Sequence, residues 1–170
     1  MALSIDIVNT WRSPRRVIRR LLEEGPREDR LVFVAMSGCF LMFVAQLPLL
    51  ARLAHESQEP GRQPLERDML IGTAFFGWLM IMPLVLYLVA AVSVPVMRLL
   101  RRPVSGFAAR LALFWAVLAA APAFLLVGLA NGLVGPGPGT RMAGVAWLAA
   151  LALFWVQGLR EGSVRQRGEG

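Results

Sequence analysis

The sequence predicts an all-α protein, a polytopic integral membrane helical bundle of about four transmembrane helices preceded by an N-terminal amphipathic interfacial helix. Two observations predict this class. Of the 170 residues, 56% are hydrophobic and 17% are charged, whereas soluble domains carry about 25% charged residues. The charges are also gathered in blocks, with long apolar runs between them. Because about 20 helical residues span the hydrocarbon core of a bilayer, these runs are long enough to cross it.

The apolar runs predict a transmembrane bundle over residues 31–159 and a polar C-terminal tail over 160–170, which we expect to be disordered. The second run is the longest. Two crossings would need about forty residues, so it predicts a single span that is tilted or kinked at Pro83. The third run, from Gly106 to Asn131, is the stretch around which the chain is organised. The expected spans are about 31–51, 69–97, 107–130 and 141–159.

Residues 1–30 form a basic amphipathic segment that we expect in the cytoplasm or at the interface. Ser13 and Pro14 are typical of a helix start, and Gly25 followed by Pro26 is typical of a helix end. At helical spacing, apolar side chains share one face and arginines mostly occupy the other. The two sets are Ile7, Trp11, Ile18, Leu21 and Leu22, and Arg12, Arg15, Arg16, Arg19 and Arg20.

Two placements of this helix follow from its amphipathic pattern. In the first, the helix lies among the lipid headgroups with its apolar face toward the acyl chains and its arginines toward phosphates. In the second, the helix packs on the cytoplasmic side of the protein itself. The residues that we expect to bind lipid or a partner are Trp11, Arg15, Arg16, Arg19 and Arg20.

The distribution of arginine predicts the orientation. Seven arginines precede the first span, three lie in the second loop and three in the tail, whereas the third loop has none before Arg141. The first loop holds three, diluted by four acids. By the positive-inside rule both termini are cytoplasmic. All 18 basic residues are arginine, which together with the abundance of Ala, Leu, Val and Gly indicates a GC-rich bacterial genome. For a bacterial multi-pass helical protein we expect the inner (plasma) membrane.

Polar residues within the spans are few, and none of the eleven acids lies in a span. Arg110 is near the start of the third span, where its stem can reach the interface; a functional buried charge is the alternative. Gln46 and Gln157 are interpreted as interhelical hydrogen-bond partners. Gly128 and Gly132 form a GxxxG pattern that we expect to be weak, because its second glycine lies at the exit of the span.

The sequence offers no arrangement for catalysis. The single histidine and single cysteine exclude a Cys–His or Ser–His–Asp site as a convincing interpretation, and their spacing to the acids matches no metal motif. We therefore expect no enzyme activity, no cofactor and no metal. The net charge of +7 is explained by arginines that flank spans and meet anionic headgroups, so nucleic acid is not an expected partner.

The order of features resembles bacterial members of the Yip1 family of small polytopic membrane proteins. A basic proline-led segment precedes a Gly-Pro break and the first span, and a later A-R-L-x-x-F-W pattern is followed by a mid-span proline. This resemblance implies a membrane protein without catalytic residues; the family is usually drawn with about five spans, against four expected here. The matching residues are Pro14, Arg16, Leu21, Gly25 and Pro26, then Gly106, Ala109, Arg110, Leu111, Phe114, Trp115 and Pro122.

Two functions are consistent with this pattern. The first is a non-enzymatic membrane protein of the Yip1 type that acts through helix–helix or lipid contacts, in membrane organisation or as an accessory subunit. Its partners would be the bilayer with its anionic headgroups, a second copy of the chain or another membrane protein. The alternative is a small transporter or channel subunit in which Arg110 lines a polar path.

Overall fold

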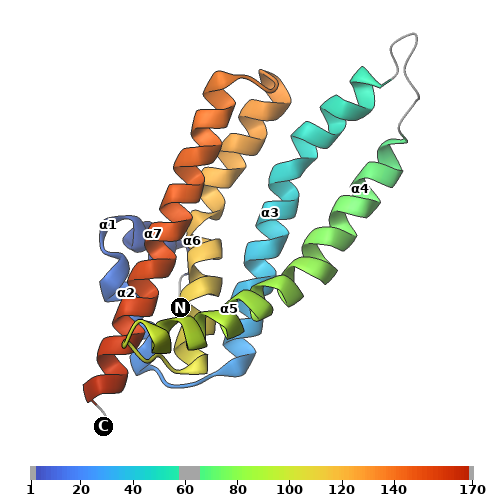
Figure 1. Cartoon of the computed structure of the whole chain (residues 1–170). Helices are drawn as coiled ribbons and strands as arrows, with labels where there is room; N and C mark the ends of the chain where they lie inside the picture. Colours follow the sequence, from blue (N-terminus) through green and yellow to red (C-terminus); the bar gives the residue numbers. More distant parts are fainter. Residues whose placement is uncertain (1–2, 58–65, 169–170) are drawn as a thin grey trace.

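The computed structural model describes residues 3–57 and 66–168, in which all regular structure is helical (Figure 1). Residues 58–65, which belong to the first loop, lie outside the described ranges. The elements are α1 (Leu3–Arg12), α2 (Pro14–Glu23), α3 (Glu28–Glu56), α4 (Arg67–Phe76), the π-helical turn η1 (Gly77–Ile81), α5 (Met82–Leu99), α6 (Gly106–Leu133) and α7 (Pro138–Gly168).

Four helical stretches in the described ranges are long and apolar enough to cross a membrane. They are α3, the continuous stretch from α4 to α5, α6 and α7. The prediction of a helical membrane bundle with four spans is therefore confirmed. α3 and α6 begin at the end of the bundle where α5 and α7 finish, and α2 lies beside it (Figure 1). We call this the basic end, after Arg98, Arg110, Arg160 and the arginines of α2.

The first half of α6 forms the centre of the bundle. Every residue from Leu111 to Ala121 is buried, and α6 is in contact with α3, α7, α5 and α1. A helix that is apolar on all sides has no face to present to water and is buried by its neighbours. Its start is fixed by Ser105, whose hydroxyl oxygen accepts a hydrogen bond of 3.2 Å from the backbone N–H of Ala108.

Glycines allow α6 to approach α3 closely. A Cβ atom at Gly128 would overlap the carbonyl oxygen of Ala45, and one at Gly132 would overlap Pro48. The expectation that this GxxxG pattern is weak is therefore wrong. The second glycine still lies within α6, because the helix continues past the expected exit to Leu133.

A second GxxxG pattern, which was not predicted from the sequence, joins α7 to α6. A Cβ at Gly158 would lie 2.7 Å from the Cβ of Ala112, and one at Gly162 would lie 2.9 Å from the Cβ of Ala108. Small residues thus face small residues, and the backbones come close enough for van der Waals packing in the absence of a hydrophobic driving force.

The irregularity expected at Pro83 takes the form of η1. Proline has no N–H to donate to the carbonyl oxygen four residues earlier. In the turn before it, the N–H of Met82 instead donates to the carbonyl oxygen of Gly77, five residues back. The long second span therefore remains one continuous helical stretch.

The expectation that residues 160–170 are disordered is wrong for the part that the structure describes, residues 160–168. α7 does not stop at Leu159 but continues as helix to Gly168. Its last turns are anchored on α2: Glu161 accepts a hydrogen bond of 3.2 Å from Arg19, and Arg165 donates to the carbonyl oxygen of Leu22. These partners are more than 140 residues away in the chain, so local composition could not reveal them.

Candidate functional site

The candidate site lies at the elbow between α1 and α2, which is docked on the middle of α6. The indole N–H of Trp11 donates to the carbonyl oxygen of Ala119 at 3.0 Å. A carbonyl oxygen has two lone pairs, so that of Ala119 can accept this bond while α6 continues through it. The ring of Trp11 also meets Phe154 of α7 edge to face, with 5.3 Å between ring centroids.

A second indole ties α6 back to α1. Trp115, which is fully buried, donates its indole N–H to the hydroxyl oxygen of Thr10 at 3.0 Å. The Thr10 hydroxyl in turn donates to the carbonyl oxygen of Asp6 at 2.7 Å. The two tryptophans therefore form reciprocal hydrogen bonds between α1 and α6, and every polar group in this chain of contacts has a partner.

The burial pattern of α1 is reversed relative to that of a water-soluble helix. Asp6 and Thr10 are 4% and 0% exposed, whereas Ile5 and Val8 are 59% and 57% exposed. The carboxylate of Asp6 is paired with the guanidinium of Arg20 on α2. Asn9 and Arg12, at the elbow end of α1, are exposed, but the arrangement of Asp6 and Thr10 inward with Ile5 and Val8 outward is suited to lipid surroundings.

α2 has the opposite pattern. Its apolar face, consisting of Val17, Ile18, Leu21 and Leu22, is buried, and the helix packs against α7. The placement in which this apolar face enters the lipid is therefore wrong, and the alternative, a helix packed on the protein itself, is the one observed. The expected boundaries of α2 are confirmed, since the helix begins at Pro14 and Gly25 follows its end with φ +87°.

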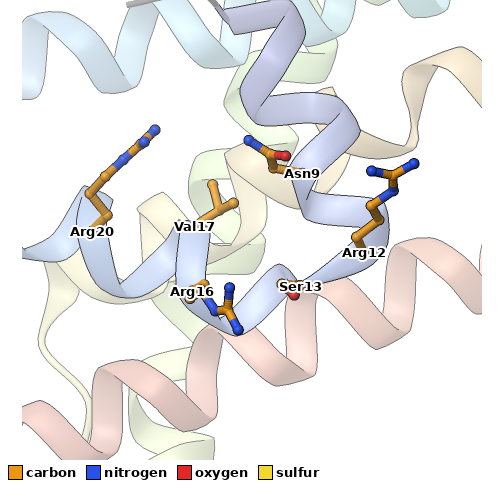
Figure 2. A pocket seen from close by; sticks show the side chains of 6 residues that line it. All are labelled: Asn9, Arg12, Ser13, Arg16, Val17 and Arg20. Atoms are coloured by element: carbon orange, nitrogen blue, oxygen red, sulfur yellow. The ribbon is translucent and has the colours of Figure 1, made fainter.

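The arginines of α2 divide into two groups. Arg15 and Arg19 face Glu161 of α7, with closest nitrogen–oxygen distances of 4.0 and 3.2 Å. Arg16 and Arg20 instead lie on the side toward α1, where Arg12 joins them (Figure 2). Arg12 belongs to the predicted polar face but not to the residues predicted to bind lipid or a partner. Arg12 lies four residues before Arg16 and eight before Arg20, and this helical spacing could have indicated that the three side chains lie on one side.

Arg12, Arg16 and Arg20 line a cleft of about 460 Å³ in this elbow (Figure 2). The remaining wall is formed by Asn9, Ser13 and Val17. Within the described ranges, neither Arg12 nor Arg16 has an acidic partner. A cleft with unneutralised guanidinium groups, an amide and a hydroxyl can bind a phosphate group through charge-assisted hydrogen bonds. We call it the elbow cleft.

The other predicted polar residues lie elsewhere. Arg110 is at the basic end, where it donates to Glu28 at 2.6 Å and to the carbonyl oxygen of Gly106 at 3.2 Å, so it connects the starts of α3 and α6. Gln46 and Gln157 are half-buried. Their amides form no hydrogen bond within the parts of the chain that the structure describes, so the expected interhelical bonds are not observed there.

Together, the fold and the elbow cleft define a multi-pass α-helical membrane protein with an arginine-lined cleft between α1 and α2. The chain matches no protein-family model, no curated protein and no solved structure. The resemblance to the Yip1 family therefore stays a prediction from the sequence.

Proposed function

We propose that this chain is a non-enzymatic membrane protein of the bacterial plasma membrane whose elbow cleft binds the headgroups of anionic phospholipids. Both termini and the basic end would face the cytoplasm, as the arginine distribution favours. The protein would act in membrane organisation or as an accessory subunit, as the resemblance to the Yip1 family implies.

The observation that carries this proposal is the cleft itself. Arg12 and Arg16 line it without an acidic partner in the described ranges, so their charge is available to a phosphate. Ile5 and Val8 are exposed on α1, the helix that contributes Asn9 and Arg12 to the cleft, which fits acyl chains near a bound headgroup. An anionic lipid supplies both components, whereas a soluble anion supplies only the first.

The proposal is tested on the full-length protein by native mass spectrometry, with phosphatidylglycerol and phosphatidylcholine offered in equal amounts. The variant R12Q/R16Q removes two guanidinium groups from the cleft. A basic side chain near an anionic surface contributes about 1 kcal/mol, so two should contribute about 25-fold in affinity. We expect this variant to bind one phosphatidylglycerol molecule fewer than the unchanged protein.

The matched control is R27Q/R98Q, which removes the same charge from two exposed positions outside the cleft. It should leave the number of bound phosphatidylglycerol molecules unchanged, because neither side chain lines the cleft. Equal losses of bound phosphatidylglycerol in the two variants would show that only the overall charge of the protein matters. A number of bound phosphatidylglycerol molecules that is unchanged in R12Q/R16Q would exclude the elbow cleft as the site.

A further inference from the structure

A second cleft opens at the basic end between α5 and α7, and it differs from the elbow cleft in chemistry. Its volume is about 460 Å³. Val96 of α5, Leu100 directly after α5 and Leu159 of α7 contribute apolar surface, and Arg102 and Arg160 contribute charge. The two helices each pack on α6, and the cleft lies where they do not close on one another. We call it the α5–α7 groove.

Trp155 lines this groove and has an unsatisfied hydrogen-bond donor. Its indole N–H is buried, and it has no acceptor within the described part of the chain. By contrast, the indoles of Trp11 and Trp115 both have acceptors at 3.0 Å. A buried donor without a partner costs about 1–3 kcal/mol, so an acceptor supplied from the groove would stabilise the protein.

The charges of the groove are also unmatched. Neither Arg102 nor Arg160 has an acidic partner among the residues that the structure describes. Arg102 is held in place by the turn that ends α5, in which its backbone N–H donates to the carbonyl oxygen of Met97 at 2.9 Å. Arg101 precedes it at φ +57°, a left-handed conformation that is unfavourable for a residue with a side chain. The turn keeps this conformation and thereby fixes the position of Arg102 after the end of α5.

We propose that the α5–α7 groove binds one anionic phospholipid, with its phosphate at Arg102 and Arg160, an ester carbonyl oxygen on the indole N–H of Trp155, and an acyl chain along the apolar wall. Trp155 precedes Arg160 by five residues, a rise of about 7.5 Å along α7. This places the indole deeper than the guanidinium, where the acyl ester groups lie below the phosphates and where tryptophan is enriched.

A phospholipid fits these features better than a partner helix does. The carbonyl oxygens of a regular helix already accept its own hydrogen bonds, so a partner helix would offer the indole N–H only a shared acceptor, as Ala119 of α6 does for Trp11. It would also need acidic side chains to match the two arginines. One lipid molecule supplies the anion, the acceptor and the apolar surface together.

The test uses the indole N–H signals of the full-length protein in a zwitterionic detergent, observed by NMR during titration with phosphatidylglycerol. The five tryptophans give separate indole signals, and W155F assigns that of Trp155. We expect a saturable downfield shift of the Trp155 signal, as for a donor that gains an acceptor. R102Q/R160Q should weaken the apparent affinity about 25-fold, since each basic side chain contributes about fivefold.

Trp147 is the internal control. Its indole N–H is also buried without an acceptor in the described ranges, but it does not line the groove. Equal shifts of the Trp147 and Trp155 signals, or a Trp155 shift that persists in R102Q/R160Q, would overturn the proposal. Glycerol phosphate should produce no shift at the same concentration, and if it acted as strongly as the lipid, a phospholipid site with an acyl chain in the groove would be excluded.

This proposal is independent of the elbow cleft. R12Q/R16Q should leave the Trp155 shift unchanged, and R102Q/R160Q should leave the lipid binding that depends on Arg12 and Arg16 unchanged. A common loss in both variants would contradict two separate sites and overturn the assignment of a lipid to the α5–α7 groove.

Discussion

The two short helices at the start of the chain, α1 and α2, have equal lengths of 10 residues and opposite burial patterns. α1 buries Asp6 and Thr10 and exposes Ile5 and Val8, whereas α2 buries its apolar face and exposes arginine. One residue, Ser13, separates them. The difference indicates that α1 is organised for lipid on its outer surface and that α2 is organised for water or headgroups.

This contrast explains how the elbow is held. α2 is attached by apolar contacts with the bundle. Such contacts stabilise the helix only where its surroundings are more polar than the surface that it buries. α1 is attached by hydrogen bonds, through Trp11, Thr10 and Trp115, which remain effective where lipid removes the hydrophobic driving force. Each helix is therefore held by the interaction that is effective in its own surroundings: hydrogen bonds for α1 next to lipid, and apolar contacts for α2 next to water or headgroups.

The largest effect expected is from the apolar face of α2. Ile18 is 2% exposed, so Ile18→Ala should lower the free energy of unfolding by about 3 kcal/mol. Val8→Ala, on the exposed side of α1, should change it by less than about 0.5 kcal/mol. Steric trapping in lipid bicelles measures both. Similar losses in the two variants would remove the contrast between the helices.

The exposed side of α1 can be tested with a charge. Val8→Asp should cost about 2.5 kcal/mol, since a carboxylate in the hydrocarbon region carries a penalty of that size. Val164→Asp is a matched control at the polar end of α7, where the original side chain is 64% exposed and a change within about 0.5 kcal/mol is expected. If Val8→Asp is as mild as the control, the outer side of α1 faces water.

The ion pair that joins α1 to α2 gives the next effect. Asp6→Asn removes the charge that Arg20 pairs with, and a buried charged hydrogen bond contributes about 2 kcal/mol. Glu23→Gln makes the same change of charge at an exposed position of α2 and should be nearly neutral. A double-mutant cycle with Arg20→Gln should give a coupling energy of similar size, and a coupling near zero would show that the pair does not fasten the elbow.

Much of the fold could be predicted because each span is encoded locally. Apolar runs between arginine blocks located the four crossing stretches, and Ser13-Pro14 with Gly25-Pro26 located α2. The features that were missed depend on contacts between distant segments. Glu161 keeps the end of α7 helical by meeting Arg19, and Gly158 matters only because Ala112 lies opposite. A single sequence shows the small residue but not the partner that it faces.

The candidate site shows the same division. The arginine-rich face of α2 was visible in the sequence, but the separation of Arg16 from Arg15 depends on where α1 and α7 lie. The bend at Ser13 was recognised as a helix start, whereas the return of α1 onto α6 was not. Asp6 and Thr10 could have been noticed as the polar residues that share one face of α1 at a spacing of four.

The smallest effect is expected at the hydrogen bond between the two helices α1 and α6. Thr10→Val keeps the volume of the side chain but removes the oxygen that accepts the Trp115 N–H, leaving a buried donor unsatisfied at a cost of about 1.5 kcal/mol. Thr10→Ser retains the hydroxyl and should recover most of this stability. Hydrogen exchange of the Trp115 indole should accelerate in Thr10→Val alone. If the serine and valine variants lose equal stability and exchange at equal rates, the methyl group of Thr10 holds α1 on α6 and the hydrogen bond does not.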